Sequence, residues 1–595
     1  SNVVPMRRVL QCQLLICLCS AILAISSDSS PFGGKNDDVY REWLGNVTFR
    51  RHTWLETSTN SDTGVAVHWN IHDEYIHIGI ACKATGWIGF GIAEAGSMKG
   101  ADIFMYVADS NELIDSHVLD ELVMPLVDDC QDWNLIFSQK KKGFLIVEAT
   151  RLLDTGDDQD RAIKNDGDDF IPATRIIAAW GDTSTPSYHG IHNRVKGAIR
   201  FFGETSVKIN EFFQNKMESE AEGYFMVQAV NYTIPSQGTT YERFCISPKD
   251  LIAQGVPIDK ELHIIGIEPM IDARTSEHVH HFTMYGDERD LSGDQNCILL
   301  YNLVFGWAPG DIPTPLPPNA GIPLGKSGMV SFSLQIHYDN PNFVTGLLDS
   351  SGTKIYYTSK KRQYDIGIIQ IGDPFISLYG TQVGSPTFIS RHTFDCRDDC
   401  SLAFLNQSIT VISEHLHMHK SGVRMKNSQF RENKEIRAGE VEYFDFDQQG
   451  GFGVIQDPFT VQPGDSFRVS CEYHAKEGEI FGIGSSQEMC IAFLSYYPRM
   501  TITREFGSLP FVCGRNLLMI SECDAGWNFS KLMNASDMGR VFGTSPASCP
   551  ISKSPSSETP GIEVISEPSS LGILSSMIRP MIYLAATNLA VLVFF

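Results

Sequence analysis

Residues 414–419 read Glu-His-Leu-His-Met-His, and residues 488–490 further along read Glu-Met-Cys. Successive side chains of a β-strand point to opposite faces, so His417 and His419 are expected on one face, where they can share one ion. Two imidazoles alone suit zinc or copper, whereas a thioether is a soft ligand that favours Cu(I). If Met489 folds back onto this face, the three side chains form a His2Met copper site that can pass through the reduced state.

A second histidine set lies upstream, with His280 and His281 in VHHFTMYG and His337 in LQIHYDNP. Three imidazoles are enough to hold a second copper. Adjacent histidines face opposite ways on a regular strand, so both reach one ion if the backbone bends there or if different ring nitrogens are used. The sequence leaves these two alternatives open. A core position is the better explanation for any single one of these histidines or for Met489, but the six together favour a metal.

Four motifs in this order, VHHFTMYG, QIHYDNP, LHMHKSG and SSQEMCIAFLSYYPR, resemble the copper type II ascorbate-dependent monooxygenases. This family includes the dopamine β-hydroxylases and the peptidylglycine hydroxylases, and the resemblance spans roughly residues 205 to 515. It implies two coppers per chain, with ascorbate as the electron donor. The implied metal ligands are His280, His281, His337, His417, His419 and Met489. His263 matches a family position outside this set and is interpreted as structural.

The resemblance also implies a division of labour. The copper of His417, His419 and Met489 would bind O2 and face the substrate, and the other copper would deliver the second electron. The expected reaction is hydroxylation of an aliphatic carbon. The chain contains no GxSxG, HExxH or P-loop motif, so no hydrolase interpretation competes. The alternative is a non-catalytic, surface-anchored binding protein with a vestigial copper core.

The composition agrees with a folded multidomain protein. A chain of 595 residues predicts two to four domains, and 42% hydrophobic with 10% aromatic residues is enough for sizeable cores. A net charge of −24 without a basic run argues against nucleic acid and against an anionic membrane surface as partners. The expected partners are a small-molecule substrate, O2 and ascorbate, and a homo-oligomer is compatible with these features.

The fold class is expected to be all-β. Residues 40–203 contain short β-runs separated by Gly, Pro and Asp clusters, which predicts a sandwich. The string GWIGFGIAEAGSMKGADIF resembles a DOMON domain. Met98 and His189 fall near positions that bind haem in some DOMON domains, and Asp102 is an alternative ligand for a hard cation. By resemblance, residues 205–350 and 351–515 form two jelly-roll-like β-sandwich copper domains.

The two ends of the chain predict the compartment. Residues 6–27 resemble a signal peptide, residues 516–570 a tail and flexible stalk, and residues 571–595 a hydrophobic anchor signal. The anchor is interpreted as a GPI-attachment signal, with a spanning helix as the alternative. We therefore expect the secretory pathway, ending at the outer cell surface or in a vesicle lumen. The expected glycosylation sites are Asn46, Asn231, Asn406, Asn528 and Asn534.

Loss of the signal peptide would leave 11 of the 14 cysteines, and an oxidising compartment favours disulfides. The resemblance implies Cys471–Cys490. Because Asp287 replaces a family cysteine, Cys245–Cys297 is the simplest remaining pair of the first copper half. Cys82 and Cys130 are expected to pair with each other. Cys396 and Cys400 are expected to pair with two of Cys513, Cys523 and Cys549, a choice that the sequence leaves open.

The substrate is expected not to be a peptide with a C-terminal glycine. Peptidylglycine hydroxylases hold the substrate carboxylate with an arginine and a tyrosine, and these positions are His415 and Phe493 here. Neither carries a permanent cation or a phenol. A small amine-like or hydrophobic substrate fits better, and Asp445, Asp447 or Glu414 would then be the partner of an amine.

Overall fold

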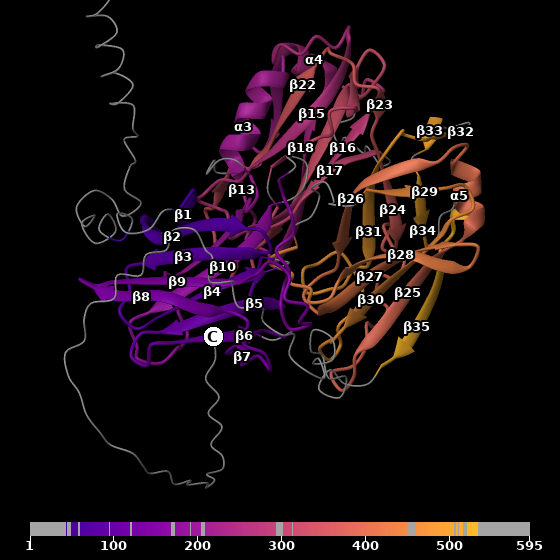
Figure 1. Cartoon of the computed structure of the whole chain (residues 1–595). Helices are drawn as coiled ribbons and strands as arrows, with labels where there is room; N and C mark the ends of the chain where they lie inside the picture. The colour runs from indigo at the N-terminus through magenta and orange to yellow at the C-terminus, as the bar shows by residue number, and fades with distance from the viewer. Residues whose placement is uncertain are drawn as a thin grey trace, which may run out of the picture. The chain divides into compact units, whose positions relative to one another are not determined.

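A computed structural model of the chain describes residues 43, 49–57, 60–93, 96–119, 122–167, 173–190, 192–203, 209–292, 302–311, 313–449, 458–504, 507–509, 511–515 and 521–532. Strands dominate these residues, which confirms the all-β class (Figure 1). The helical elements are α3 (Ile209–Glu220), α4 (Pro248–Ala253), α5 (Asp398–Phe404) and the 3-10 helix η1 (Ser521–Cys523). The expected signal peptide and anchor lie outside the described residues.

The first domain is a sandwich of two antiparallel sheets. One sheet has the strand order β1-β2-β3-β9-β8, and the other has the order β11-β10-β4-β5-β6-β7. Alternate residues of β2, such as Val65, Val67 and Trp69, enter the core between the sheets. The strands are β1 (Arg51–Thr57), β2 (Asn60–His72), β3 (Tyr75–Cys82), β4 (Trp87–Ala93), β5 (Ala101–Val107), β6 (Glu112–His117), β7 (Leu126–Val127), β8 (Asn134–Lys141), β9 (Phe144–Leu152), β10 (Thr174–Gly181) and β11 (Arg194–Ile199).

The second domain, the first copper half, is built from a sheet of order β12-β22-β15-β19-β23 and a sheet of order β14-β20-β16-β17. The second of these sheets carries the first histidine set. The strands are β12 (Gly223–Gln228), β13 (Tyr232–Thr233), β14 (Thr239–Ile246), β15 (Glu261–Met270), β16 (Val279–Asp287), β17 (Asn302–Trp307), β18 (Thr314–Pro315), β19 (Ala320–Gly325), β20 (Ser331–Asp339), β21 (Leu348–Asp349), β22 (Gly352–Thr358) and β23 (Tyr364–Asp365).

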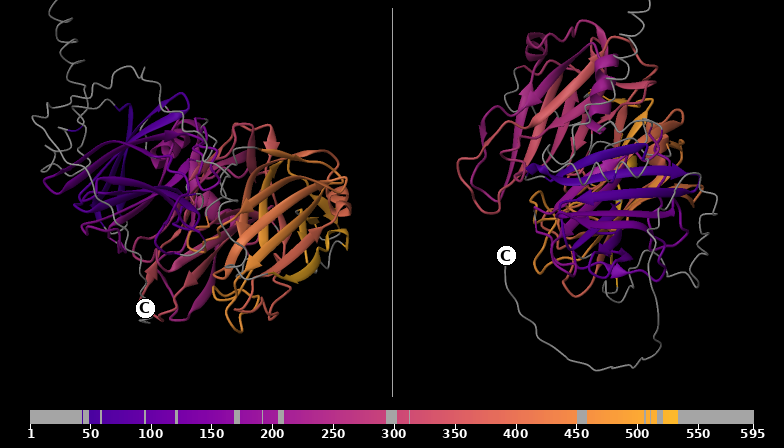
Figure 2. Two further views of the ribbon diagram at one scale, coloured as in Figure 1. Left: turned by 60° about the horizontal axis from the view of Figure 1, so that its bottom comes forward. Right: turned by 60° about the vertical axis from the view of Figure 1, so that its left-hand side comes forward.

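The third domain, the second copper half, has sheets of order β29-β26-β31-β24-β34 and β28-β27-β30-β25-β35, whose strands run from orange to yellow in Figure 2. The central strands β26 and β31 border the second set of expected ligands: His417 ends β26, and His419 and Met489 lie just outside the two strands. The strands are β24 (Gly367–Gly372), β25 (Ser390–Cys396), β26 (Ile409–His417), β27 (Gly422–Arg431), β28 (Lys434–Val441), β29 (Phe459–Val461), β30 (Ser466–Tyr473), β31 (Ile491–Tyr497), β32 (Ile502–Arg504), β33 (Gly507–Leu509), β34 (Val512–Gly514) and β35 (Gly526–Lys531).

Three of these strands, β22, β23 and β35, fall outside the expected domain boundaries. β22 pairs with β12 and β15, so the first copper half continues past residue 350, where its end was expected. The reason is that Ile355 and Tyr357 of this strand pack into the core of the first half. Similarly, β35 pairs with β25, so the region expected to be a tail begins with a strand of the second half.

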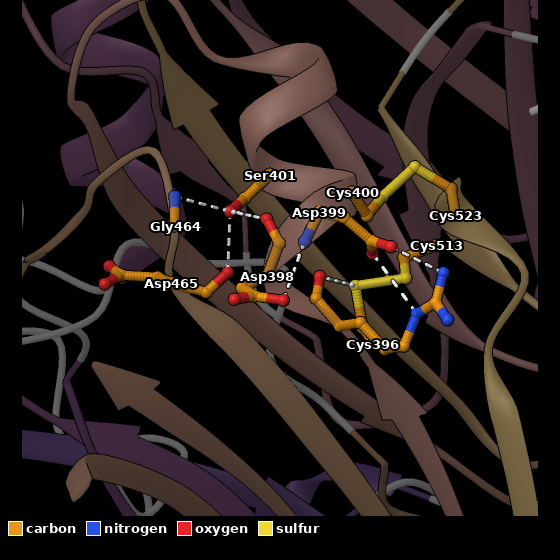
Figure 3. The surroundings of a disulfide bond; sticks show 10 residues. Cys396, Asp398, Asp399, Cys400, Ser401, Gly464, Asp465, Cys513 and Cys523 are labelled. Atoms are coloured by element: carbon orange, nitrogen blue, oxygen red, sulfur yellow. Dashed lines mark hydrogen bonds and ion pairs between the residues drawn. A yellow bond between two sulfur atoms is a disulfide. The ribbon is translucent and has the colours of Figure 1, made fainter. Parts of the chain in front are cut away.

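Two disulfides of the second half join β25 to β34 and α5 to η1 (Figure 3). Cys396 bonds to Cys513 and Cys400 bonds to Cys523, which resolves the choice that the sequence left open. Ser401, beside Cys400 on α5, donates to the backbone oxygen of Asp465 and accepts from the Gly464 amide at 2.9 Å. These contacts fix α5 against the turn before β30.

The expectation for the first domain's cysteines is wrong. Cys82 is a free, fully buried thiol on β3, while Cys130 is disulfide-bonded. Burial raises the pKa of the Cys82 thiol, because a thiolate would be poorly solvated there. Cys245 is also disulfide-bonded, and its expected partner Cys297 lies outside the described residues.

Candidate metal centre

The first histidine set forms at a β-bulge. On β16 the pairing register with β20 shifts between Val279 and His281, so His280 is the extra residue of the bulge. A bulge re-aims the side chain that it carries, so both adjacent histidines can face the same way. Their Nδ1 atoms lie 2.8 Å apart, and the ligand atoms of His280, His281 and His337 all lie within 4.8 Å of one another. The backbone bend is therefore the alternative that this chain uses.

The ring of His337 is held in one orientation. Tyr241, its cross-strand neighbour on β14, stacks on it with ring centroids 4.3 Å apart. Nε2 of His337 lies 3.0 Å from Oγ of Ser485, while its Nδ1 is buried without a hydrogen-bond partner. Nε2 of His280 is likewise buried and unpartnered. Buried ring nitrogens without partners are costly in a folded protein, and metal ligation removes that cost.

The second histidine set lies at the end of β26. The strand was expected to include both histidines, but it ends at His417, and His419 follows it in an irregular segment. The two rings nevertheless lie side by side, with centroids 5.1 Å apart. Nδ1 of His417 donates to Oε1 of Gln449 at 2.6 Å, and Nδ1 of His419 donates to the backbone oxygens of Gly484 and Gln487. These bonds leave Nε2 of each ring for a ligand, and Nε2 of His419 is buried without a partner.

Met489 is buried two residues before β31 and lines the same cavity as His417. Its backbone oxygen accepts a hydrogen bond from the Tyr473 hydroxyl at 2.6 Å. The next residue, Cys490, is joined to Cys471 by a disulfide, as the resemblance implied. The hydrogen bond from Tyr473 and the neighbouring disulfide hold the backbone at Met489 in place, which restricts the positions that its side chain can take.

All five rings are set to remain neutral. Burial, followed by the charges of His417 and Lys420, lowers the pKa of His337 to about 3. Burial lowers the pKa of His417 to about 4, although its bond to Gln449 acts in the opposite direction. The pKa values of His280, His281 and His419 are also well below the usual range, mainly because of burial. Neutral imidazoles keep the lone pairs that a metal needs.

The donor chemistry fits copper. Three imidazoles in one set, and in the other two imidazoles with a thioether that lines the same cavity as His417, are soft to intermediate ligands, and the sulfur suits Cu(I). The two sets adjoin, with the ring centroids of His281 and His417 5.4 Å apart. His281, His417 and Met489 all face a cavity of about 260 Å³ between the two copper halves. None of the described residues that line this cavity is a carboxylate.

The two positions singled out for the substrate lie opposite each other. His415 of β26 pairs with Phe493 of β31, and both line the cavity. Glu414 points elsewhere, because its carboxylate is paired with Arg437 at 2.5 Å and accepts from Asn427 at 2.8 Å. Its proposed role as the partner of a substrate amine is therefore wrong.

Other candidate ligands have different roles. His263 is structural, as interpreted, because Nε2 contacts Asp365 at 2.9 Å and Nδ1 accepts from the Arg362 amide. Asp102 forms a buried ion pair with Arg151 at 2.6 Å, and its second carboxylate oxygen has no hydrogen-bond partner, so its role as a cation ligand stays a prediction. The same holds for haem binding, since Met98 packs against apolar residues of β4 and β5 and His189 contacts Tyr188.

The sequence did not reveal the residues that orient the ligands. Gln449, Ser485 and Glu488 each make specific bonds around the histidines, but a single Gln, Ser or Glu in a loop carries no signal of such a role. For Glu488 the position directly before Met489 was a clue, since its carboxylate accepts from the His419 amide at 2.9 Å.

Two sandwich domains that each place a cluster of histidines beside one cavity define a class of proteins with two candidate metal sites. Profiles of known families agree with this description. The DOMON domain matches residues 61–171, and the N-terminal and C-terminal domains of copper type II ascorbate-dependent monooxygenase match residues 225–345 and 365–509. The chain belongs to the copper type II ascorbate-dependent monooxygenase family.

Relatives cover most of the chain. DBH-like monooxygenase protein 1 of Homo sapiens is 28% identical over 464 residues, which is 73% of this chain and 72% of the relative. Tyramine beta-hydroxylase of Caenorhabditis briggsae is 25% identical and covers 73% of this chain and 75% of its own length. MOXD1 homolog 1 of Drosophila melanogaster is 25% identical and covers 78% of this chain and 70% of its own length.

The features expected of a secreted protein are compatible with the described residues. Asn231, Asn406 and Asn528 are exposed, while Asn46 and Asn534 lie outside the described residues. Disulfides fit an oxidising compartment. None of the helices in the described part of the chain has the length and hydropathy of a membrane span.

Proposed function

We propose that the protein is a copper- and ascorbate-dependent monooxygenase that hydroxylates an aliphatic carbon of a small amine-like or hydrophobic substrate with O2. One observation carries the proposal: two clusters of histidines lie side by side, and His281 of one cluster, His417 of the other and Met489 face one cavity. A non-catalytic protein with a vestigial copper core would not need to retain every ligand, nor the bonds that orient them.

The residues of this chain have separate roles in the proposed reaction. Copper, when bound, supplies the one-electron chemistry that O2 needs before it reacts with a C–H bond. His280, His281 and His337 would hold one ion, and His417, His419 and Met489 the other. Gln449 and the backbone oxygens of Gly484 and Gln487 keep the Nδ1 protons of His417 and His419 in place, which directs Nε2 of each ring to the metal.

The cavity walls favour a substrate without a carboxylate. A buried carboxylate needs a charge-assisted partner, and losing such a partner costs about 2–5 kcal/mol of binding. His415 is weakly basic and Phe493 is apolar, so neither replaces an arginine–tyrosine pair. Phe493 provides an aromatic wall near Met489, suited to a ring or a hydrocarbon beside the reactive carbon.

A charged amine that enters the cavity would lose its hydration, and none of the described lining residues offers a carboxylate in return. Since no described lining residue is a carboxylate and Glu414 is already paired, Asp445 and Asp447 remain the proposed partners of an amine. An uncharged aromatic or aliphatic molecule needs no such partner and is the simpler fit to the walls.

The experiment is substrate-dependent oxygen uptake by the copper-loaded, full-length protein with ascorbate. The panel is phenylethylamine, its uncharged alcohol analogue and a glycine-extended peptide, with an untargeted metabolite comparison beside it. We expect turnover of one of the first two and none of the peptide. Efficient turnover of the peptide alone would contradict the substrate proposal. Absence of bound copper together with absence of ascorbate-dependent uptake would favour the non-catalytic alternative.

The location is proposed on the same terms. We infer a secreted protein held at the outer cell surface by a GPI anchor, and phosphatidylinositol-specific phospholipase C should then release it from intact cells. Retention after this treatment would favour a spanning tail.

A further inference from the structure

One loop of the second copper half, residues 482–487, reaches both histidine sets. Its Gly484 and Gln487 backbone oxygens accept from Nδ1 of His419 at 3.0 and 2.7 Å. The side chain of Ser485, between them, lies 3.0 Å from Nε2 of His337, which belongs to the first copper half. Met489 follows two residues after the loop ends. A single short loop therefore contacts one expected ligand of each copper and leads directly into a third.

Several hydrogen bonds hold the loop in this position. The Gln487 amide nitrogen donates to the Gly484 oxygen at 2.8 Å, and the Gln487 side chain accepts from the Gly484 amide at 2.9 Å. Glu488, fully buried, accepts from the amides of His419 and Ser421 at 2.9 and 2.6 Å. A side chain at Gly482 would collide with Gln487, since a Cβ there would lie 2.1 Å from Oε1. The loop cannot shift without breaking several of these bonds.

On the side of the first copper half, Tyr241 and His337 contact this loop. Tyr241 donates its hydroxyl proton to the backbone oxygen of Ile483 at 2.7 Å, and the same ring stacks on His337. His337 and Ser485 are 0% and 2% exposed, so water does not replace their bond. Tyr241 therefore stacks on the ring of His337, and Ser485 contacts its Nε2. Both residues connect His337 to the loop of the second copper half.

We propose that Ser485 is a positioning residue that ties His337 to the loop that leads into Met489. Its hydroxyl oxygen accepts the Nε2 proton of His337, which fixes the tautomer and leaves Nδ1 of that ring as the copper ligand. Through this bond the geometry of the first site depends on the loop that orients His419 and Met489. The proposal rests on the proposed copper assignment, but the bond itself is a property of the metal-free protein. An outer partner of this kind typically contributes about 10–100-fold to metal affinity.

The test compares three variants of the full-length protein. Ser485→Ala removes the hydroxyl, Ser485→Thr keeps it, and Ser486→Ala is the matched control, because Ser486 is the exposed neighbour of the same type. Hydrogen–deuterium exchange at the imidazole C2 position of His337 is measured by mass spectrometry on copper-free protein. Copper affinity is measured separately by competition with a chelator.

We expect Ser485→Ala to accelerate exchange at His337 and to weaken one of the two copper sites by about 10–100-fold. Ser486→Ala should match the wild-type protein in both measurements, and Ser485→Thr should recover most of the protection. Unchanged exchange at His337 in Ser485→Ala would overturn the proposal, as would an equal effect of Ser486→Ala. Because exchange is read without metal, failure of the copper assignment would appear as absent copper binding with the exchange result intact.

Discussion

Replacing Gln449 by leucine tests how the second site is oriented. Gln449 is 7% exposed, and its Oε1 accepts the Nδ1 proton of His417 at 2.6 Å. Leucine keeps much of the volume but offers no acceptor, so a buried imidazole N–H loses its partner. The side-chain amide nitrogen of Gln449 also donates to the backbone oxygen of Phe446 at 3.0 Å, and the substitution removes that bond as well.

The magnitude follows from these contacts. A buried donor left without a partner costs about 1–3 kcal/mol, and a partner of a metal-binding histidine is worth about 10–100-fold in metal affinity. We therefore expect the copper of His417 and His419 to bind about 10–100-fold more weakly in Gln449→Leu, with the other copper unchanged.

The assay is competition between the reduced protein and a Cu(I) chelator. The control is Gln448→Ala, since the adjacent Gln448 hydrogen-bonds Asp447 rather than a histidine. If both copper affinities of Gln449→Leu equal those of the wild-type protein, or if Gln448→Ala weakens binding to the same degree, the orientation argument is wrong.

Three further predictions concern the stability and reactivity of the folded protein. Burial lowers the pKa of His392 to about 4, so between pH 6.5 and 4 the unfolded chain binds a proton at this residue and the folded protein does not. As the pH falls through this range, the wild-type protein should therefore lose about 1.4 kcal/mol of stability per pH unit relative to His392→Gln, measured by thermal unfolding. A pH-independent difference between the two proteins would refute this. The Cys471–Cys490 disulfide spans 19 residues, so the double alanine variant should be less stable by about 3 kcal/mol in denaturant unfolding, and equal midpoints would count against it. Because the thiol of Cys82 is fully buried and its pKa is raised, iodoacetamide should label it after denaturation and not in the native protein; rapid native labelling would contradict its burial.

The fold and the grouping of the histidines into two clusters were largely accessible from the sequence. The alternation of apolar residues predicts strands, and the spacing of His417 and His419 places both on one face even though the strand ends at His417. Spacing works here because it reflects a local rule, the two-residue repeat of a strand.

Features that depend on tertiary contacts were not accessible. The bulge at His280 is set by pairing with β20, which lies about 50 residues further along the chain. The rejection of Glu414 depends on Arg437, which the hairpin of β27 and β28 brings to it. The boundary at residue 350 was placed too early because β22 looks like any strand until its pairing with β12 and β15 is known.

The central claim is that the chain holds two coppers, one of them through the sulfur of Met489. The most direct test is copper K-edge X-ray absorption of the ascorbate-reduced, fully loaded protein beside Met489→Ile, a change that roughly conserves volume. The account predicts two coppers per wild-type chain with a sulfur neighbour at one of them, and loss of that sulfur signal with retention of the fold in the variant. An identical sulfur signal in both proteins, or none in the wild-type protein, would contradict it.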